Sequence, residues 1–332
     1  MTIIERLQTN GICRTGSPAR GFRYRSAKGA VSREDLARID ALKIPPAWTR
    51  VAVARSPKSA VQAVGQDAAG RWQYLYHESH AARRERSKQE RLVRFIAALP
   101  RMRRAVARDL RRRGLPREKV LAGILKILGT CFLRPGNQVY TAQNGSYGLA
   151  TLRRQHVSVA GDTVVFDFMG KSRKRQRREL VDPEIARLVR KQLRYPGEVF
   201  KFQSEDGGMT DVHTGHINAY IKEVMGEQFS AKDFRTWAGS LLCACALARA
   251  GVERAHTKHE RKKRIAAALR EVADHLGNTP AVCRSSYVFP AVLRKYEQGR
   301  VIGAYFEDVA ELSNGNASRV ERSERALIEL LR

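Results

Sequence analysis

Residues 148–181, GLATLRRQHVSVAGDTVVFDFMGKSRKRQRRELV, decide the fold class of this chain. Residues 148–159 and Thr163–Met169 have the β-branched, alternating character of strands, and a Gly-Asp pair forms a turn between them. Arg175–Val181 is a candidate third strand, which leaves Lys171 in the turn that precedes it. The stretch therefore predicts a three-stranded β insertion.

Helical patterns lie on both sides of this insertion. Residues 120–133 are apolar enough for a buried helix. After the third strand, Asp182 supplies an N-cap and Pro183 a first helical residue. Further helices are expected over residues 212–224, from Ser230 toward Gly251, and over residues 261–276.

The last predicted helix is short. Thr279 and Pro280 restart a helix after Gly277, and this helix should carry Tyr287. Pro290 should end or kink it, because proline has no N–H to donate.

The N-terminal part of the chain is β-rich. Residues 50–55 alternate as a strand does, and residues 71–77 alternate again, with Trp72, Tyr74 and Tyr76 on one face. These aromatic side chains suit a sheet core or cross-strand pairs equally well as a face that lies against DNA beside Arg71. We therefore expect an α+β protein with a small β-rich domain over residues 1–88 and a larger, mainly helical domain over residues 89–332.

The charge of the chain points to a polyanionic partner. It has 62 Lys and Arg against 33 Asp and Glu, a net charge of +29. Nucleic acid is the commonest partner of such a chain. The sequence has no apolar run long enough for a signal peptide or a membrane span. We expect a cytoplasmic protein that binds nucleic acid.

The cysteines and histidines give no metal-binding pattern. The five cysteines are irregularly spaced, and no Cys or Cys/His pair has the spacing of a zinc site. His256 and His259 are three residues apart, but no acidic or Cys cluster accompanies them. We expect reduced thiols, no bound metal and no cofactor.

Breaking a phosphodiester without a metal needs a nucleophile, cations for the developing charge, and an acid for the leaving oxygen. Candidates for these parts lie in four short segments. Each is unremarkable by itself, because a chain this rich in Arg and Lys places cations near turns by chance. The candidates are Arg134, Lys171, Arg235, Asn278 and Tyr287.

The order and spacing of these segments resemble the active-site motifs of the poxvirus-like and bacterial type IB DNA topoisomerases. The resemblance covers nearly the whole chain and depends on the motifs being in this order. The matching segments are IPPAW (residues 44–48), GRWQYLYH (70–77), RPGNQVY (134–140), YGLATL (147–152), FMGK (168–171), KDFR (232–235), GNTP (277–280) and Tyr287.

The resemblance implies a tyrosine recombinase-like catalytic fold and a role for each matched residue. Arg134 and Arg235 would bind the nonbridging oxygens of the scissile phosphate. Lys171 would be the general acid, and Tyr287 would attack to form a 3′-phosphotyrosyl link. The enzyme would relax both signs of supercoil without ATP or metal, as a monomer that closes like a clamp around the duplex.

Two positions depart from the poxvirus pattern. Asn278 stands where those enzymes have His, so it can donate a hydrogen bond to phosphate but carries no charge. Asn137 stands where they have a Lys that touches bases, which puts sequence preference in doubt. The resemblance also implies DNA contacts by Tyr74, Tyr76 and Tyr140.

Two other functions remain open. A tyrosine recombinase shares the fold and the covalent chemistry, but recombinases usually have His-x-x-Arg at the second arginine, where this chain has Lys232-Asp-Phe-Arg235. A non-enzymatic basic DNA-binding protein would need none of the catalytic residues. Replacing Tyr287 by Phe would separate it from an enzyme.

Overall fold

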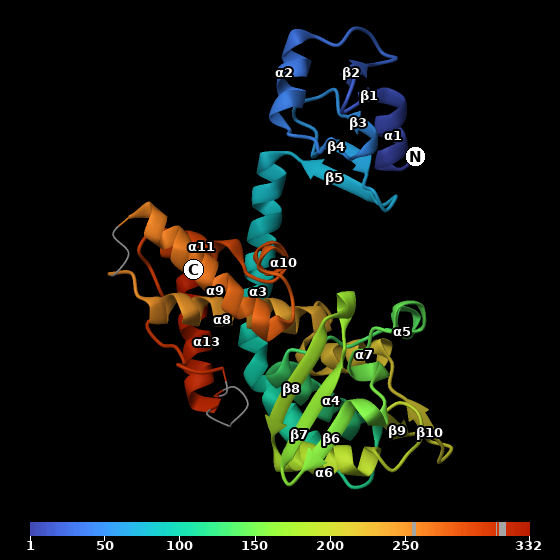
Figure 1. Cartoon of the computed structure of the whole chain (residues 1–332), viewed down its shortest axis with the longest axis vertical. Coiled ribbons are helices and arrows are strands. Elements are labelled where there is room, and N and C mark those ends of the chain that lie inside the picture. The colour runs from blue at the N-terminus through green and yellow to red at the C-terminus, as the bar shows by residue number, and fades with distance from the viewer. Residues whose placement is uncertain (254–256, 310, 312–316) are drawn as a thin grey trace. The chain divides into compact units, whose positions relative to one another are not determined.

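The computed structural model describes most of the chain and divides it into two compact units, Met1–Lys88 and Gln89–Arg332 (Figure 1). The helices and strands confirm the α+β class, with a small β-containing unit followed by a larger, mainly helical one. The described residues are 1–253, 257–309, 311 and 317–332, without the side chains of Ala81, Tyr140 and Ala317.

The first unit is built on one antiparallel sheet with the strand order β2-β1-β3-β4-β5. Buried Ala52, Val53, Ala63 and Val64 from its central strands form the core. The strands at residues 50–55 and 71–77 are confirmed as β3 and β5. The elements are α1 (Ile3–Asn10), β1 (Ile12–Ser17), β2 (Gly21–Arg25), α2 (Arg33–Ala41), β3 (Thr49–Val53), β4 (Val61–Gln66) and β5 (Trp72–Tyr76).

Helix α3 (Glu78–Leu110) contains the boundary between the units. The second unit then consists of helices around one continuous core, with a sheet of order β6-β7-β8. Its helices are α4 (Arg117–Cys131), α5 (Gln138–Asn144), α6 (Pro183–Gln192), α7 (Thr214–Met225), α8 (Ala231–Ala250), α9 (Lys258–Leu276), α10 (Pro280–Ser286), α11 (Pro290–Glu297) and α13 (Ala317–Leu331).

The three-stranded insertion is confirmed, but its first strand is shorter than the sequence predicts. The strands are β6 (Val157–Ala160), β7 (Thr163–Met169) and β8 (Arg175–Val181). Before β6 the chain forms two short 3₁₀ turns, η1 (Leu149–Thr151) and η2 (Arg154–His156), so the expected strand over residues 148–156 is wrong. The physical reason is that the backbone of this segment bonds to the loop after α4 instead of to a strand.

Two other expectations need correction. Tyr287 is the C-cap residue that follows α10 and is not inside that helix. Pro290 begins α11 instead of ending a helix, because the first turn of a helix does not use the missing N–H of proline. The structure also has a second, two-stranded sheet of β9 (Lys201–Gln203) and β10 (Met209–Asp211), which the sequence did not indicate.

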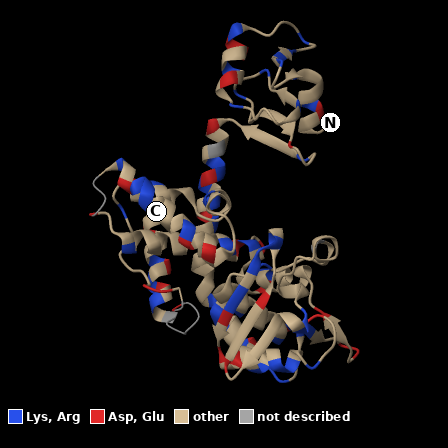
Figure 2. Cartoon of the chain, viewed as in Figure 1, with Lys and Arg blue, Asp and Glu red and all other residues tan. Residues whose placement is uncertain are grey.

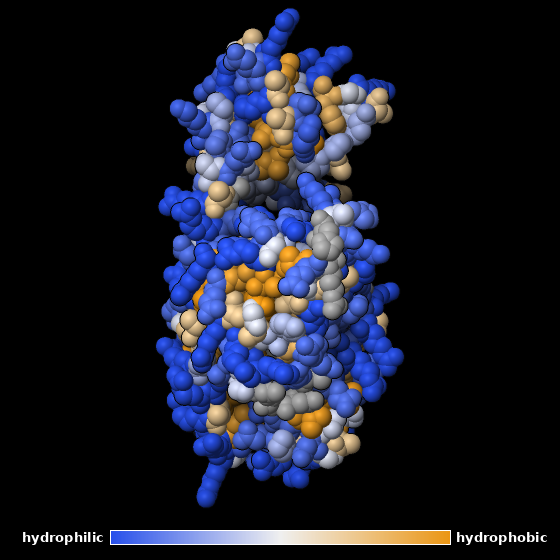
Figure 3. Space-filling view, turned by 90° about the vertical axis from the view of Figure 1, so that its left-hand side faces the viewer, coloured by the Kyte–Doolittle hydropathy of each residue, from blue (hydrophilic) through white to orange (hydrophobic). Residues whose placement is uncertain are grey.

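Helix α8 runs through the core of the second unit. Fifteen of its residues are buried, and its predicted start is confirmed by the Asp233 carboxylate, which accepts from the N–H of Ser230 at 2.8 Å. The face in Figure 3 is mostly hydrophilic, with separate hydrophobic patches. Among the described helices, none combines the length and the apolarity needed to span a membrane.

Candidate active site

Arg134 is held by the loop that follows α4. Phe132, the C-cap of α4, has a left-handed backbone (φ 54°), which turns the chain sharply. The carbonyl of Arg134 accepts from Leu149 N–H at 3.0 Å. Gly136 and Gly148 lie so close that a Cβ on Gly148 would be 2.5 Å from Gly136 Cα. The backbones of the RPG and YGLA motifs therefore pack directly against each other, and this contact fixes the position of the Arg134 backbone.

Arg235 lies in the second turn of α8 and is only 3% exposed. Its guanidinium donates to the backbone carbonyls of Phe132 and, at 2.8 Å, Leu276. Its Nε is buried and has no hydrogen-bond partner within the described part of the chain. Burial, and then the nearby charge of Arg134, lower the pKa of Arg235 to about 10, which leaves it protonated at neutral pH.

Asn278 follows the helix end at Gly277, which adopts a left-handed conformation. Its side-chain Oδ1 accepts from Arg134 at 2.6 Å. Its Nδ2 is buried and makes no hydrogen bond to any described residue. The site therefore contains two buried donors, one on Asn278 and one on Arg235, that lack an acceptor.

Helix α8 also positions Tyr287. A Cβ on Gly239 would lie 2.8 Å from the Tyr287 carbonyl oxygen, so only glycine allows this approach. Ser240 Oγ donates to the same carbonyl at 3.3 Å and accepts from Phe289 N–H at 3.0 Å. The Arg235 Cζ atom lies 4.8 Å from the centre of the Tyr287 ring. The nucleophile candidate is thus fixed to the helix that carries Arg235.

The electrostatics of the cluster make Tyr287 easier to ionise than a free tyrosine. Burial acts to raise the pKa of Tyr287, but the positive charges of Arg235 and Arg134 lower it by more, so that the net pKa lies below its usual value. Across the described residues, no carboxylate forms an ion pair with either arginine. The positive charge of the cluster is therefore left for an anion.

Lys171 makes no hydrogen bond or ion pair with this cluster among the described residues. It occupies η3 (Lys171–Arg173) at the tip of the β7–β8 hairpin, as predicted, and Ser172 and Arg173 there have left-handed backbones. Its side chain is exposed and has no hydrogen bond or ion pair within the described residues. Figure 2 shows Lys and Arg along β8 and at this tip. The structure brings Arg134, Arg235, Asn278 and Tyr287 together. It places Lys171 at the tip of the β7–β8 hairpin, without a bond to any of these four.

The candidate DNA-binding residues of the first unit have structural partners. Arg71 forms a salt bridge of 2.9 Å with Asp67, although its side chain remains 74% exposed. Tyr74 and Tyr76 are half-buried against the core formed by Leu7 and the central strands, and their rings stack at 6.2 Å. Their packing accounts for these aromatic residues without DNA, while their exposed edges leave a DNA contact open.

The two candidates near Arg134 lie at the start of α5. Asn137 is exposed and is the N-cap of this helix, where its Oδ1 accepts from Val139 N–H at 2.8 Å. Tyr140 belongs to the same helix, but its side chain lies outside the described residues.

The described cysteines and histidines form no metal cluster. All five cysteines are free thiols, and burial raises the pKa of Cys283 beside the site. No group of three or more His, Cys, Asp or Glu among the described residues is arranged to hold a metal ion. His256 lies outside the described residues.

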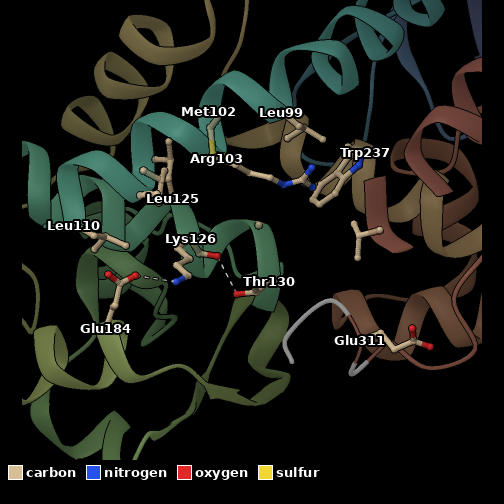
Figure 4. A pocket seen from close by; sticks show the side chains of 14 residues that line it. Leu99, Met102, Arg103, Leu110, Leu125, Lys126, Thr130, Glu184, Trp237 and Glu311 are labelled. Carbon is tan, nitrogen blue, oxygen red and sulfur yellow. Dashed lines mark hydrogen bonds and ion pairs between the residues drawn. The ribbon is translucent and has the colours of Figure 1, made fainter. Parts of the chain in front are cut away.

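A cavity of about 260 Å³ lies elsewhere in the second unit (Figure 4). It is lined mainly by apolar side chains of α3 and α4 and by Trp237 of α8. None of the five predicted site residues is among its described lining residues, so this cavity is not the candidate active site.

Some residues that build the site were missed in the sequence. Arg91 of α3 pairs through both nitrogens with Asp233 of the KDFR segment, at 2.7 Å each, and so anchors the start of α8. Lys174 donates to the Asn278 carbonyl at 3.0 Å. Gly239 is the one with a sequence signal, since a glycine inside an apolar helix weakens that helix and so suggests a close contact.

The chain matches two family models. Residues 77–314 match the model described as "Eukaryotic DNA topoisomerase I, catalytic core". Residues 21–67 match "Bacterial DNA topoisomerase IB, N-terminal domain". The first match alone covers more than half of the chain.

Known proteins of the same kind are similar along most of their length. The DNA topoisomerase 1B of Acanthamoeba polyphaga mimivirus is 36% identical over 275 residues, which cover 80% of this chain and 81% of the relative. The DNA topoisomerase I of monkeypox virus and the DNA topoisomerase 1B of vaccinia virus (strain Copenhagen) are each 23% identical over 232 residues, 69% of this chain and 70% of each relative. This chain therefore belongs to the type IB DNA topoisomerases, a family of DNA-binding isomerases.

Proposed function

We propose that this chain relaxes positive and negative supercoils by cutting one DNA strand through Tyr287, letting the strand rotate, and resealing it. One observation carries the proposal. Two buried donors without acceptors, Arg235 Nε and Asn278 Nδ2, lie in the same cluster as the Tyr287 ring and Arg134. Buried donors without partners are costly, and a phosphate would supply oxygens for both.

In the cutting step, the Tyr287 oxygen attacks the scissile phosphorus. The phenol proton leaves to solvent, a bond forms between Tyr287 and the 3′ phosphate, and the bond from phosphorus to the 5′ oxygen breaks. Arg134, Arg235 and Asn278 donate to the nonbridging oxygens, where charge develops in the transition state. Because these donors are already held in place, little reorganisation is needed at that moment.

Lys171 is proposed as the general acid that protonates the departing 5′ oxygen. The hairpin position supports this role, because an exposed lysine at a tip can reach a duplex that the unit binds. In resealing, the 5′ hydroxyl attacks the phosphotyrosine, Lys171 takes its proton back, and Tyr287 leaves and regains a proton. The linkages broken and formed are equal in number, so no ATP is required.

The remaining proposals concern how the enzyme is used. We propose that both units bind the duplex, as a monomeric clamp, and that the first unit contributes Arg71, Tyr74 and Tyr76 while the second contributes Asn137 and Tyr140. The net charge of +29 supports strong phosphate binding. We propose a bacterial, cytoplasmic enzyme associated with the nucleoid, because residues 21–67 match a bacterial N-terminal domain. We also propose a catalytic unit of the tyrosine recombinase-like kind, which the match of residues 77–314 to a topoisomerase I catalytic core supports.

The experiment is relaxation of supercoiled plasmid of either sign, without ATP and with a chelator of divalent metals. We expect the unmodified protein to relax both plasmids. Tyr287→Phe should relax neither, while binding DNA as tightly as the unmodified protein. Tyr296→Phe is the control, because Tyr296 is a buried tyrosine of α11 and is not in the cluster.

The same assay separates the rival functions. A tyrosine recombinase would exchange strands between two sites and leave the supercoils in place. A basic binding protein would bind DNA equally well with either tyrosine replaced and would form no covalent complex. Either outcome would remove the proposed function.

A further inference from the structure

The C-terminal end of α9 collects cationic side chains. Arg178 donates to the carbonyl of His275 at 2.6 Å, Arg235 donates to that of Leu276 at 2.8 Å, and Lys174 donates to that of Asn278 at 3.0 Å. The last carbonyls of a helix have no partner within it, and the helix dipole makes this end negative. Carbonyls are neutral, so they hold these cations in place and leave the positive charge uncompensated. Carboxylates would neutralise it.

Two of these cations come from the same edge of the β7–β8 hairpin. Lys174, Gln176 and Arg178 alternate along the chain, so they lie on one face of β8 and the residue that precedes it. Gln176 is 6% exposed and packs on Gly277, where a Cβ would lie 2.2 Å from Gln176 Oε1. This face of the hairpin is therefore docked on the segment that carries Asn278.

We infer that Lys174 is a positioning residue for the strand-cutting reaction: it fixes the backbone of Asn278 and adds a positive charge beside the phosphate site. The inference rests on the proposed function. Arg134 fixes the side-chain Oδ1 of Asn278, and Lys174 fixes the backbone carbonyl of the same residue. With both oxygens held, the Nδ2 group can point in only one direction. Asn278 itself is neutral, and the Lys174 ammonium supplies a charge next to it.

Arg177 provides a matched control. It lies on the same hairpin, on the opposite face of β8, and its side chain is 63% exposed, with its nearest carboxylate, Asp167, 3.9 Å away. Replacing Lys174 or Arg177 by Met removes one positive charge from one hairpin. The two variants therefore lose the same general attraction for DNA and differ only in the contact with Asn278.

The experiment measures the single-turnover rate at which the protein becomes covalently linked to a nicked duplex that cannot be resealed. We expect Lys174→Met to be slower by about tenfold, a smaller loss than removal of a donor that touches the transition state itself. Lys174→Arg should recover most of the rate, and Arg177→Met should stay within about twofold of the unmodified protein. DNA affinity should be equal for the two Met variants when each also carries the Tyr287→Phe substitution, which prevents covalent linkage during the binding measurement.

A substrate with sulfur as the 5′ bridging atom separates positioning from proton donation. Sulfur leaves without being protonated, so it should not restore the rate of Lys174→Met. Three outcomes would overturn the inference even if the unmodified protein cuts DNA. They are a Lys174→Met rate restored by the sulfur substrate, equal rates for Lys174→Met and Arg177→Met, and a Lys174→Arg rate as low as that of Lys174→Met. An unmodified protein that forms no covalent complex would overturn the proposed function and this inference with it.

Discussion

The two parts of the proposed active site differ in how far they are assembled in this structure. Arg134, Arg235, Asn278 and Tyr287 are linked by a hydrogen bond of 2.6 Å and a ring contact of 4.8 Å, and Arg235 is buried. Lys171 is exposed at a hairpin tip with no bonded partner in the described chain. The part proposed to bind phosphate is preorganised, and the part proposed to donate the proton is not.

The difference follows from the chemistry of the side chains. A buried guanidinium must find acceptors, and the carbonyls of Phe132 and Leu276 supply them and fix its position. A lysine on a flexible stem can stay in water until a substrate arrives. We therefore expect substitutions in the two parts to impair strand cutting in different ways. The largest expected effect is at Lys171.

Lys171→Ala should slow strand cutting by about 10²–10⁴-fold, the usual contribution of a general acid. A substrate with a 5′ bridging sulfur should restore the rate, because sulfur needs no proton to leave. Single-turnover cutting of both substrates measures this. Arg177→Ala is the control, and a Lys171→Ala variant that sulfur does not rescue would contradict the role given to Lys171.

Arg235→Lys should slow cutting by about 10²–10³-fold, whichever substrate is used, because the single nitrogen of lysine cannot reach the two separate carbonyls and a phosphate as the planar guanidinium fork does. It should also destabilise the fold by about 1–3 kcal/mol, since buried carbonyls lose their donor. Denaturant unfolding and single-turnover cutting measure the two effects. The control is Arg270→Lys, an exposed arginine of α9; equal behaviour of the two variants would argue against a preorganised cluster.

Gly239→Ala should displace Tyr287, because the added Cβ would lie 3.0 Å from the Tyr287 Cβ. We expect about 1–3 kcal/mol of destabilisation and a loss in cutting rate of about tenfold. Gly215→Ala in α7 is the matched control, since no atom lies within 4 Å of its Cβ position. It should be neutral or slightly stabilising, and a harmless Gly239→Ala would show that the contact does not position the nucleophile.

The smallest effect concerns the acidity of Tyr287. The two arginines favour the charged phenolate, so the pKa of Tyr287 lies below its usual value, and Arg134→Ala should raise it. Because the folded-state pKa is depressed, the resulting stability builds up as the pH rises through the folded-state pKa, is fully present above the unfolded pKa of about 10, and is lost as the pH falls below the folded-state pKa. Difference absorbance titration of the unmodified protein against Tyr287→Phe measures the midpoint. A midpoint above that of free tyrosine would mean that burial outweighs the arginines.

Local patterns in the sequence predicted much of the fold. Strand β8 was predicted with its bounds, and so was the cap at Asp182, because alternation and capping depend on neighbouring residues. The strand expected over residues 148–156 was wrong, because its geometry is set by a contact between Gly136 and Gly148. Contacts between residues that are distant in the chain leave little trace in local patterns.

The candidate site shows the same limit. The five residues were identified by the order of their motifs, and four of them meet in the structure. The supports, such as Arg91 on Asp233 and Lys174 on Asn278, join segments more than a hundred residues apart. No spacing in the sequence indicates such pairs, since each residue alone is an ordinary surface cation.

The most direct test of the central claim is to identify the residue that becomes linked to DNA. The covalent complex with a nicked duplex would be digested and its linked peptide identified by mass spectrometry. We expect one adduct, a 3′ phosphate on Tyr287, and none with Tyr287→Phe. An adduct on another residue, or relaxation that persists in Tyr287→Phe, would contradict it.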